Sequence, residues 1–235
     1  MWLTTEYESV TLFSLRLSTA TSSGGKTLLV PTPYAIKMAL LDVACRALGA
    51  GLAEQRWGEL RELQVALRPA AKAVVTNLFQ KVLKPYKNPP KPGEPDFGPF
   101  QRTIGYREYT YLEGPLGVGL GWDGSERRDW LADLLVQVNY FGKRGSFMQV
   151  TQLPKFTVEL PAGYVLSTRP QEEFPVGGTL QLLDDCAENL PFAKANIYSG
   201  EKLRSGKDRI TRHIILPYRL SRSSKTYSLY EHFEL

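Results

Sequence analysis

A proline-rich segment in the first half of the chain is the feature that most restricts the fold. Between Lys84 and Phe100 the sequence contains six prolines. Because proline has no backbone N–H to donate, such a segment is excluded from the middle of a sheet or a helix. Strand-like runs precede and follow it, at 73–83 and 101–109. The sequence therefore predicts a long hairpin over about residues 73–112 with an extended, lysine-bearing tip, and loops of this length are usually functional or disordered.

The strand after the prolines, Gln-Arg-Thr-Ile-Gly-Tyr-Arg-Glu-Tyr at 101–109, is the best indication of function. Because side chains alternate in a strand, Tyr106 would face away from Arg107 and Tyr109. A cation beside an aromatic ring can contact both the phosphate and the base of a single-stranded nucleic acid. The alternative is a strand whose tyrosines pack in a core and whose Arg107 pairs with an acid.

The composition is that of a globular protein. Hydrophobic residues make up 43% and charged residues 23% of the 235 residues, enough for one large domain or two small ones. We expect no membrane span and no N-terminal targeting segment, because no run has the required apolarity. Cys45 and Cys186 form neither a disulfide framework nor a metal spacing, which predicts a cytoplasmic chain with free thiols.

Positive charge is concentrated near the C-terminus. Residues 202–225 hold eight Lys and Arg against the single acid Asp208, a net of +7, whereas the whole chain has +5, which leaves −2 for the remainder. Segregated cations can hold an anion such as a phosphate backbone on one surface. A solvated pair of basic strands would give the same pattern.

Hydrophobic periodicity predicts an α+β fold. The expected elements are, in order, a strand at 9–18, a helix from Thr32 to Gly49, a weaker helix at 52–67, the hairpin, a strand at 117–122 and a helix at 127–138. Strand-like runs separated by turns make up the rest. This order predicts a ferredoxin-like (RRM-like) core over 1–150 with the long hairpin inserted, followed by a smaller β-rich region over 151–235.

Two glycine-bearing basic loops are candidate phosphate contacts. Gly25-Lys26-Thr27 is not a nucleotide-binding phosphate loop, because Ala20 stands where the first glycine is required, but Lys26 can still contact a nucleic-acid backbone. The second loop, at 140–147, carries Lys143 and Arg144 between glycines, and backbone amides in such a turn can meet a phosphate. Either loop can equally be an exposed turn without a ligand.

The sequence offers little for catalysis. His213 and His232 are the only histidines, so we expect no metal ion and no cofactor. His213 follows Arg212 and could act as an acid or base in an RNA cleavage that uses the 2′-hydroxyl. A hydrogen-bonded strand histidine or a plain RNA contact is the alternative. No nucleophile motif of the Gly-x-Ser-x-Gly type is present.

Three motifs follow one another in the first 150 residues. They are a proline pair with a small-residue helix at 29–41, the Arg-Glu-Tyr strand at 101–109 and the glycine-rich basic turn at 141–147. In this order they resemble the Cas five family of the RAMP superfamily, the RNA-binding subunit near the foot of type I CRISPR Cascade complexes. The resemblance implies a ferredoxin-like core with a thumb between its middle strands. It also implies a grip on the 5′ handle of a CRISPR RNA (crRNA) and contacts with a backbone subunit and the large subunit.

We therefore expect a noncatalytic RNA-binding subunit of a CRISPR effector that meets target DNA only through the complex. In one branch of the family this subunit cleaves precursor RNA with a tyrosine, a lysine and a histidine, and the lack of a Lys-His pair here argues against cleavage. Two alternatives stay open: a metal-independent endoribonuclease using His213, and a basic scaffold protein without RNA specificity. The candidate RNA contacts are Lys81, Lys84, Lys87 and Lys91 on the hairpin, Arg102, Arg107 and Tyr109 at its base, Tyr106 and Asn77 as further base readers, and Lys26, Lys37, Lys143, Arg144 and Arg212 as secondary contacts.

Overall fold

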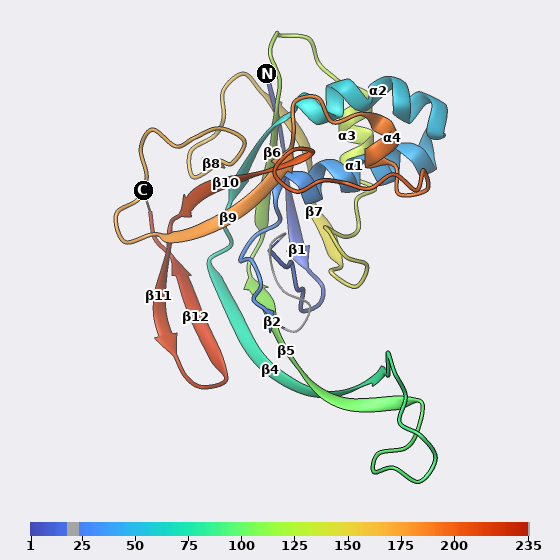
Figure 1. The fold of residues 1–235 in the computed structure, drawn as a ribbon. Coiled ribbons are helices and arrows are strands. Elements are labelled where there is room, and N and C mark those ends of the chain that lie inside the picture. The colour runs from blue at the N-terminus through green and yellow to red at the C-terminus, as the bar shows by residue number, and fades with distance from the viewer. Residues whose placement is uncertain (18–23, 235) are drawn as a thin grey trace.

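The structure is a computed structural model that describes residues 1–17 and 24–234. One long hairpin projects from a body of sheets and helices (Figure 1). The elements are β1 (Trp2–Ser9), β2 (Gly24–Gly25), α1 (Pro33–Ala47), α2 (Ala50–Glu62), β3 (Gln64–Arg68), β4 (Lys72–Pro85), β5 (Phe100–Glu113), β6 (Leu116–Gly121), α3 (Asp129–Leu135), β7 (Met148–Thr157), β8 (Val165–Leu166), β9 (Thr179–Cys186), α4 (Phe192–Ala195), β10 (Arg209–Leu216), β11 (Tyr218–Ser223) and β12 (Tyr227–His232). The fold is α+β, as predicted, and no helix in the described part of the chain has the length and apolarity needed to cross a membrane.

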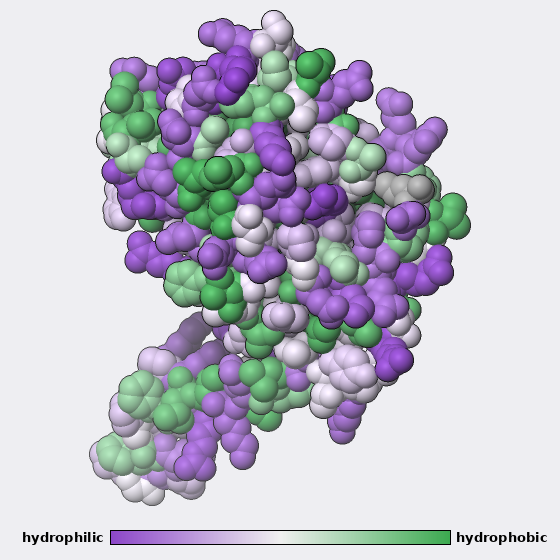
Figure 2. Space-filling view, turned by 180° about the vertical axis from the view of Figure 1, so that it is seen from behind, coloured by the Kyte–Doolittle hydropathy of each residue, from purple (hydrophilic) through white to green (hydrophobic). Residues whose placement is uncertain are grey.

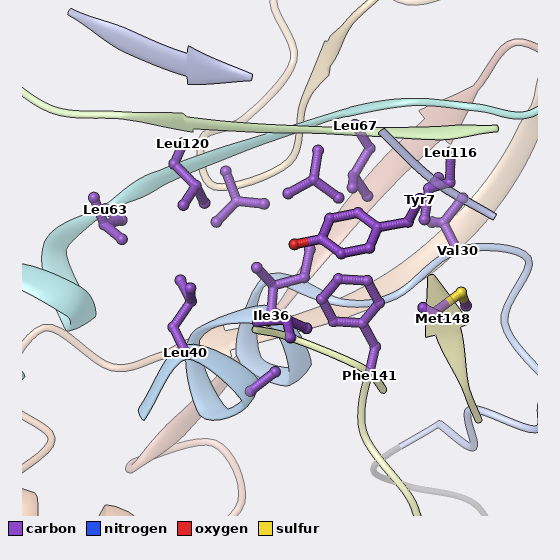
Figure 3. Close-up of a cluster of buried hydrophobic side chains, with 14 of the residues drawn as sticks. Tyr7, Val30, Ile36, Leu40, Leu63, Leu67, Leu116, Leu120, Phe141 and Met148 are labelled. Atoms are coloured by element: carbon purple, nitrogen blue, oxygen red, sulfur yellow. The ribbon is translucent and has the colours of Figure 1, made fainter. Parts of the chain in front are cut away.

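The first sheet has the strand order β7-β1-β6-β3-β8 and is antiparallel throughout. Helix α1 packs against one face of it: Ile36 and Leu40 point toward Leu67 and Leu120 of the sheet (Figure 3). The buried Tyr7 lies in the same layer and donates its hydroxyl to the carbonyl of Leu135 at 2.7 Å, which ties the sheet to the end of α3. This layer between sheet and helices is the main hydrophobic core.

Strand β6 is buried on both faces, and glycines make this possible. Leu116 and Leu120 point into the helix-covered core, while the alternate glycines point to the opposite face. A Cβ on Gly121 would lie 2.8 Å from the ring of Trp2, and one on Gly117 would lie 2.7 Å from the hydroxyl of Tyr164. Neighbouring aromatic side chains therefore approach the β6 backbone more closely than any side chain would allow.

The second sheet, β11-β12-β4-β5-β2, contains the predicted hairpin. The β4–β5 ladder runs from the Lys72–Glu113 pair to the Pro85–Phe100 pair, and the proline-rich segment forms its tip. Strand β12 pairs with β4 only up to Thr76, and β2 pairs with β5 only at Tyr106 and Arg107. Residues 78–105, here called the arm, therefore form a two-stranded ribbon with no third strand in the described chain. Residues 72–77 and 106–113 are called the root.

Two sequence-based predictions of secondary structure are wrong. The first strand is β1 at Trp2–Ser9 and not 9–18, because the buried Thr5 breaks the apolar alternation by which a strand is recognised. The helix expected at 52–67 ends at Glu62, and Gln64–Arg68 form β3. A short apolar run such as Val-Ala-Leu does not distinguish a buried strand from a helix by periodicity.

The start of α1 is confirmed in detail. Thr32 accepts a hydrogen bond from the amide of Ala35 at 3.1 Å, and Pro33 occupies the first turn, where its missing N–H costs nothing. The division of the chain at residue 150 stays a prediction. Strand β7 crosses that position and pairs with β1.

Candidate nucleic-acid interface

The arm presents cations to solvent. Lys81, Lys84, Lys87, Lys91 and Arg102 are all exposed. Within residues 1–17 and 24–234, no carboxylate lies at ion-pair distance from any of these five side chains. In Figure 2 the projecting arm shows hydrophobic residues scattered among hydrophilic ones. Unpaired cations interleaved with exposed apolar groups are typical of surfaces that bind single-stranded nucleic acids.

The pairing register divides the hairpin into two faces. Directly paired residues of antiparallel strands share a face, so Phe79 and Tyr106 lie together with their ring centroids 5.0 Å apart. Arg102 follows on the same face and, with Lys81 and neighbouring arm residues, lines a cavity of about 330 Å³. The opposite face carries Leu78 beside Arg107, and then Tyr109. Tyr106 thus faces away from Arg107 and Tyr109, as the alternation predicts.

A polar network fixes the root. The Tyr106 hydroxyl lies 2.9 Å from Asn77 Oδ1 and 2.9 Å from Glu108 Oε1, and Glu108 Oε2 accepts a hydrogen bond from the amide of Thr27 at 2.9 Å. Burial, and then the hydrogen bond to Glu108, raise the pKa of Tyr106 to about 12. Asn77 Nδ2 also donates to the carbonyl of Lys225 at 3.3 Å. Asn77 and the Tyr106 hydroxyl are therefore engaged in holding the hairpin to the body.

Three cations converge beside the root, from segments far apart in the sequence. Arg16 forms an isolated β-bridge with Thr27, and Gly25 pairs with Arg107. The basic turn packs on the same segment, because a Cβ on Gly142 would lie 2.5 Å from Leu15. These cations, Arg16, Arg107 and Lys143, are called the root cluster.

The three positive charges of the root cluster repel one another, which favours the binding of an anion. Partial burial, and then the charges of Arg16 and Arg107, hold the pKa of Lys143 below its usual range. In the described chain, neither Lys143 nor Arg107 has a carboxylate at ion-pair distance. A bound phosphate would relieve this mutual repulsion. The exposed Lys26 adjoins Gly25, and the exposed Arg144 follows Lys143.

Two predicted phosphate contacts, Lys37 and Arg212, lie beside one buried carboxylate instead. The Lys37 ammonium is 2.7 Å from Asp185 Oδ1, with both side chains nearly fully buried. Arg212 Nε is 3.5 Å from the other oxygen of the same carboxylate. Together these contacts join α1 to the β9–β10 pair. His213 is exposed and, as the next residue in the strand, points to the face opposite Arg212.

Several cations of the basic C-terminal segment are paired with carboxylates, although the sequence suggests that they form a free cationic surface. Arg209 pairs with Asp184 of β9, as Arg212 does with the neighbouring acid, while Arg204 and Lys194 pair with Asp208. Part of the net charge of this segment is therefore neutralised within the fold. The sequence analysis also missed Arg16, which was assigned to an ordinary strand. Among the residues that the structure describes, no three His, Cys, Asp or Glu side chains gather as a metal site.

Comparison with known proteins bears on the whole chain. No family model matches it. CRISPR-associated protein Cas5 of Archaeoglobus fulgidus is 22% identical to it, in an alignment that covers 95% of this chain and 96% of that protein. The crystal structure of a CRISPR protein from Archaeoglobus fulgidus has the same fold, with a TM-score of 0.51 at 14% identity over 99% of this chain and 92% of that one. The resemblance to the Cas five family that the three sequence motifs indicate is thereby confirmed.

Proposed function

We propose that this chain is a noncatalytic, RNA-binding subunit of a type I CRISPR effector, and that its hairpin and root cluster hold the 5′ handle of the crRNA. The observation that carries the proposal is a set of cations that lack a carboxylate partner in the described chain, namely Lys81, Lys84, Lys87, Lys91 and Arg102 on the arm and Arg107 and Lys143 at the root. Fixed cations of this kind bind a phosphate backbone by displacing its counterions. Similarity to a CRISPR-associated protein Cas5 supports the biological setting.

The strand order supports a ferredoxin-like core. Strands β7-β1-β6-β3 lie in the spatial order of a βαββαβ unit, with α1 and α2 between β1 and β3, and α3 between β6 and β7. The hairpin is inserted between β3 and β6, which are the second and third strands of that unit in chain order. This is the place where the family resemblance puts a thumb, so we assign the arm and its root to that role.

The proposal divides the RNA contacts by position. Lysines of the arm contact successive phosphates, while Arg107 and Lys143 hold the strand where it crosses the root. Tyr109 shares the face of Arg107 and is half-buried, so its exposed edge is available for a base. The exposed apolar side chains of the arm, Phe79, Leu83 and Ile104, are left to contact a neighbouring backbone or large subunit.

Binding measurements test this assignment. Fluorescence anisotropy should show that the purified chain binds repeat-derived single-stranded RNA more tightly than an unrelated RNA of equal length, and that this preference survives a rise from low to physiological salt. Arg107→Gln should weaken binding by roughly 10- to 100-fold, the usual effect of losing a hydrogen bond to a charged group. Arg127→Gln is the matched control, because this arginine is exposed, lies beyond the end of β6 that points away from the hairpin, and is paired with Asp129. Equal effects of both variants would refute the proposed contact.

Assays on the same purified chain distinguish this proposal from the two alternatives, a basic scaffold protein and an endoribonuclease. Binding that loses all sequence preference at physiological salt would favour a basic scaffold, because nonspecific charge attraction falls steeply with salt. Cleavage of repeat RNA in the presence of a chelator, abolished by His213→Ala, would replace the noncatalytic assignment with that of a metal-independent endoribonuclease.

A further inference from the structure

A cavity of about 870 Å³ opens beside the root cluster. It lies between α1, residues 14–17, the turn at 140–143 and the segment 195–198 at the end of α4. Its volume falls within the range of about 300–1,000 Å³ that is typical of ligand sites. The hairpin itself contributes none of its described lining residues.

Aromatic rings and cations line this cavity together. Tyr34, Tyr140 and Tyr198 supply rings, and the guanidinium of Arg209 lies over the ring of Tyr34 at 4.1 Å from its centroid. Arg209 is held in this position by its ion pair with Asp184. Flat groups fixed on a wall in this way provide a surface on which a planar ligand can stack.

The rim carries apolar side chains that water covers in the free protein. Ile197 and Tyr198 line the cavity, yet they are 84% and 86% exposed. A ligand that enters against them would remove apolar surface from water on both sides, which favours binding. The exposure of Tyr198 also indicates that it contributes little to packing in the free protein.

The charges in the cavity set the orientation of a ligand. Lys143 and Arg16 line the side next to the root, while Asp42 and Asp184 line the walls. A phosphate is attracted to the first pair, whereas both carboxylates are already ion-paired, Asp184 with Arg209 and Asp42 with Arg46. A nucleobase, which is planar and carries N–H groups that carboxylates accept, suits the interior.

Lys143 belongs both to this cavity and to the root cluster beside Arg107. A strand held at Arg107 therefore reaches the mouth of the cavity through a shared cation. We propose that the cavity receives one unpaired base of the RNA strand held at the root, stacked on its tyrosines, with the adjoining phosphate at Lys143. This inference rests on the proposed function and adds to it a base-binding pocket outside the hairpin.

An abasic scan tests the pocket on the full chain. A set of otherwise identical repeat-derived RNAs, each lacking the base at one position, is titrated against the wild-type protein and Tyr198→Ala. For the wild type, one position should lose roughly 5- to 150-fold in affinity without its base, the range for a single base–aromatic stack. Tyr198→Ala should remove that position's sensitivity and leave the others unchanged. Phe174→Ala, a variant at another exposed aromatic residue that does not line the cavity, should keep the wild-type profile.

The outcomes are distinct. If the wild type binds RNA selectively but Tyr198→Ala alters no position of the abasic profile, the pocket inference is wrong and the proposed function stands. If no selective RNA binding is found, the proposed function fails and the pocket fails with it. A nucleoside monophosphate that saturates the wild type, together with an unchanged abasic profile, would assign the cavity to a free nucleotide and overturn the inference.

Discussion

The buried ion pair between α1 and β9 predicts that removing one partner destabilises the fold more than removing the other. Lys37 Nζ lies 2.7 Å from Asp185 Oδ1, and the two side chains are 3% and 4% exposed. Asp185 has further donors, because its carboxylate accepts from the amide of Cys186 at 2.8 Å and lies 3.5 Å from Arg212 Nε. In the described chain Lys37 has no second carboxylate. Lys37→Met therefore leaves a carboxylate that still has partners, whereas Asp185→Leu leaves a buried ammonium without one.

Breaking a buried pair by removing one partner costs about 3–5 kcal/mol. We expect Asp185→Leu to reach the upper part of this range and Lys37→Met to stay at its lower limit. In a chain of this length, a loss of about 4–5 kcal/mol in Asp185→Leu corresponds to a decrease of roughly 8–20 °C in Tm. The double variant Lys37→Met/Asp185→Leu should recover much of the loss, because two apolar side chains of similar volume replace a buried pair at little cost.

Urea unfolding followed by circular dichroism measures these differences in the free energy of unfolding. Equal losses in the two single variants, or a double variant as unstable as Asp185→Leu, would refute the reasoning. RNA binding by Lys37→Met, measured under conditions where the variant is folded, provides the second readout. We expect wild-type affinity, whereas a tenfold or greater loss would mean that Lys37 contacts RNA, as the sequence first suggests.

Four further variants test other parts of the structure. Gly121→Val should lower the free energy of unfolding by about 1–3 kcal/mol, because its Cβ would lie 2.8 Å from the Trp2 ring. Gly58→Ala should raise the free energy of unfolding by about 0.5–1 kcal/mol in the same urea assay, because alanine favours the helix α2 and its Cβ would meet nothing within 4 Å. Tyr106→Phe should destabilise the chain by about 1–3 kcal/mol by leaving partly buried acceptors unpaired, and unchanged unfolding would contradict the root network. RNA affinity should fall as the pH rises through the lowered pKa of Lys143 on the alkaline side, because phosphate binding raises that pKa and the bound state then holds more protons. Anisotropy titrations should show a weaker decline for Lys143→Arg, and equal declines would exclude this lysine as the cause.

The features that the sequence predicted well are local ones. Proline has no N–H wherever it lies, so the six prolines between Lys84 and Phe100 indicate a hairpin tip without knowledge of the rest of the fold. The Thr32 cap likewise depends only on its neighbours along the chain. These elements appear in the structure within a residue or two of their predicted bounds.

The features that the sequence analysis missed depend on distant partners. Asp185, the ion-pair partner of the buried Lys37, is 148 residues away from it in the sequence. The same carboxylate also pairs with Arg212 of the neighbouring strand. A lysine in an amphipathic helix gives no local sign of such a partner, so it was assigned to the surface. The cavity beside the root is similar, since four separate segments must fold together before Tyr34 and Tyr198 line one space.

The arm also has a consequence for how a chain of this kind can change over evolutionary time. Its eight residues from 78 to 85 reach about 26 Å, and a ribbon of only two strands contributes little stability of its own. The main core lies between the first sheet and its helices and takes no side chain from the arm. The length and the charge of the arm can therefore change in evolution to suit a new ligand without loss of the main core.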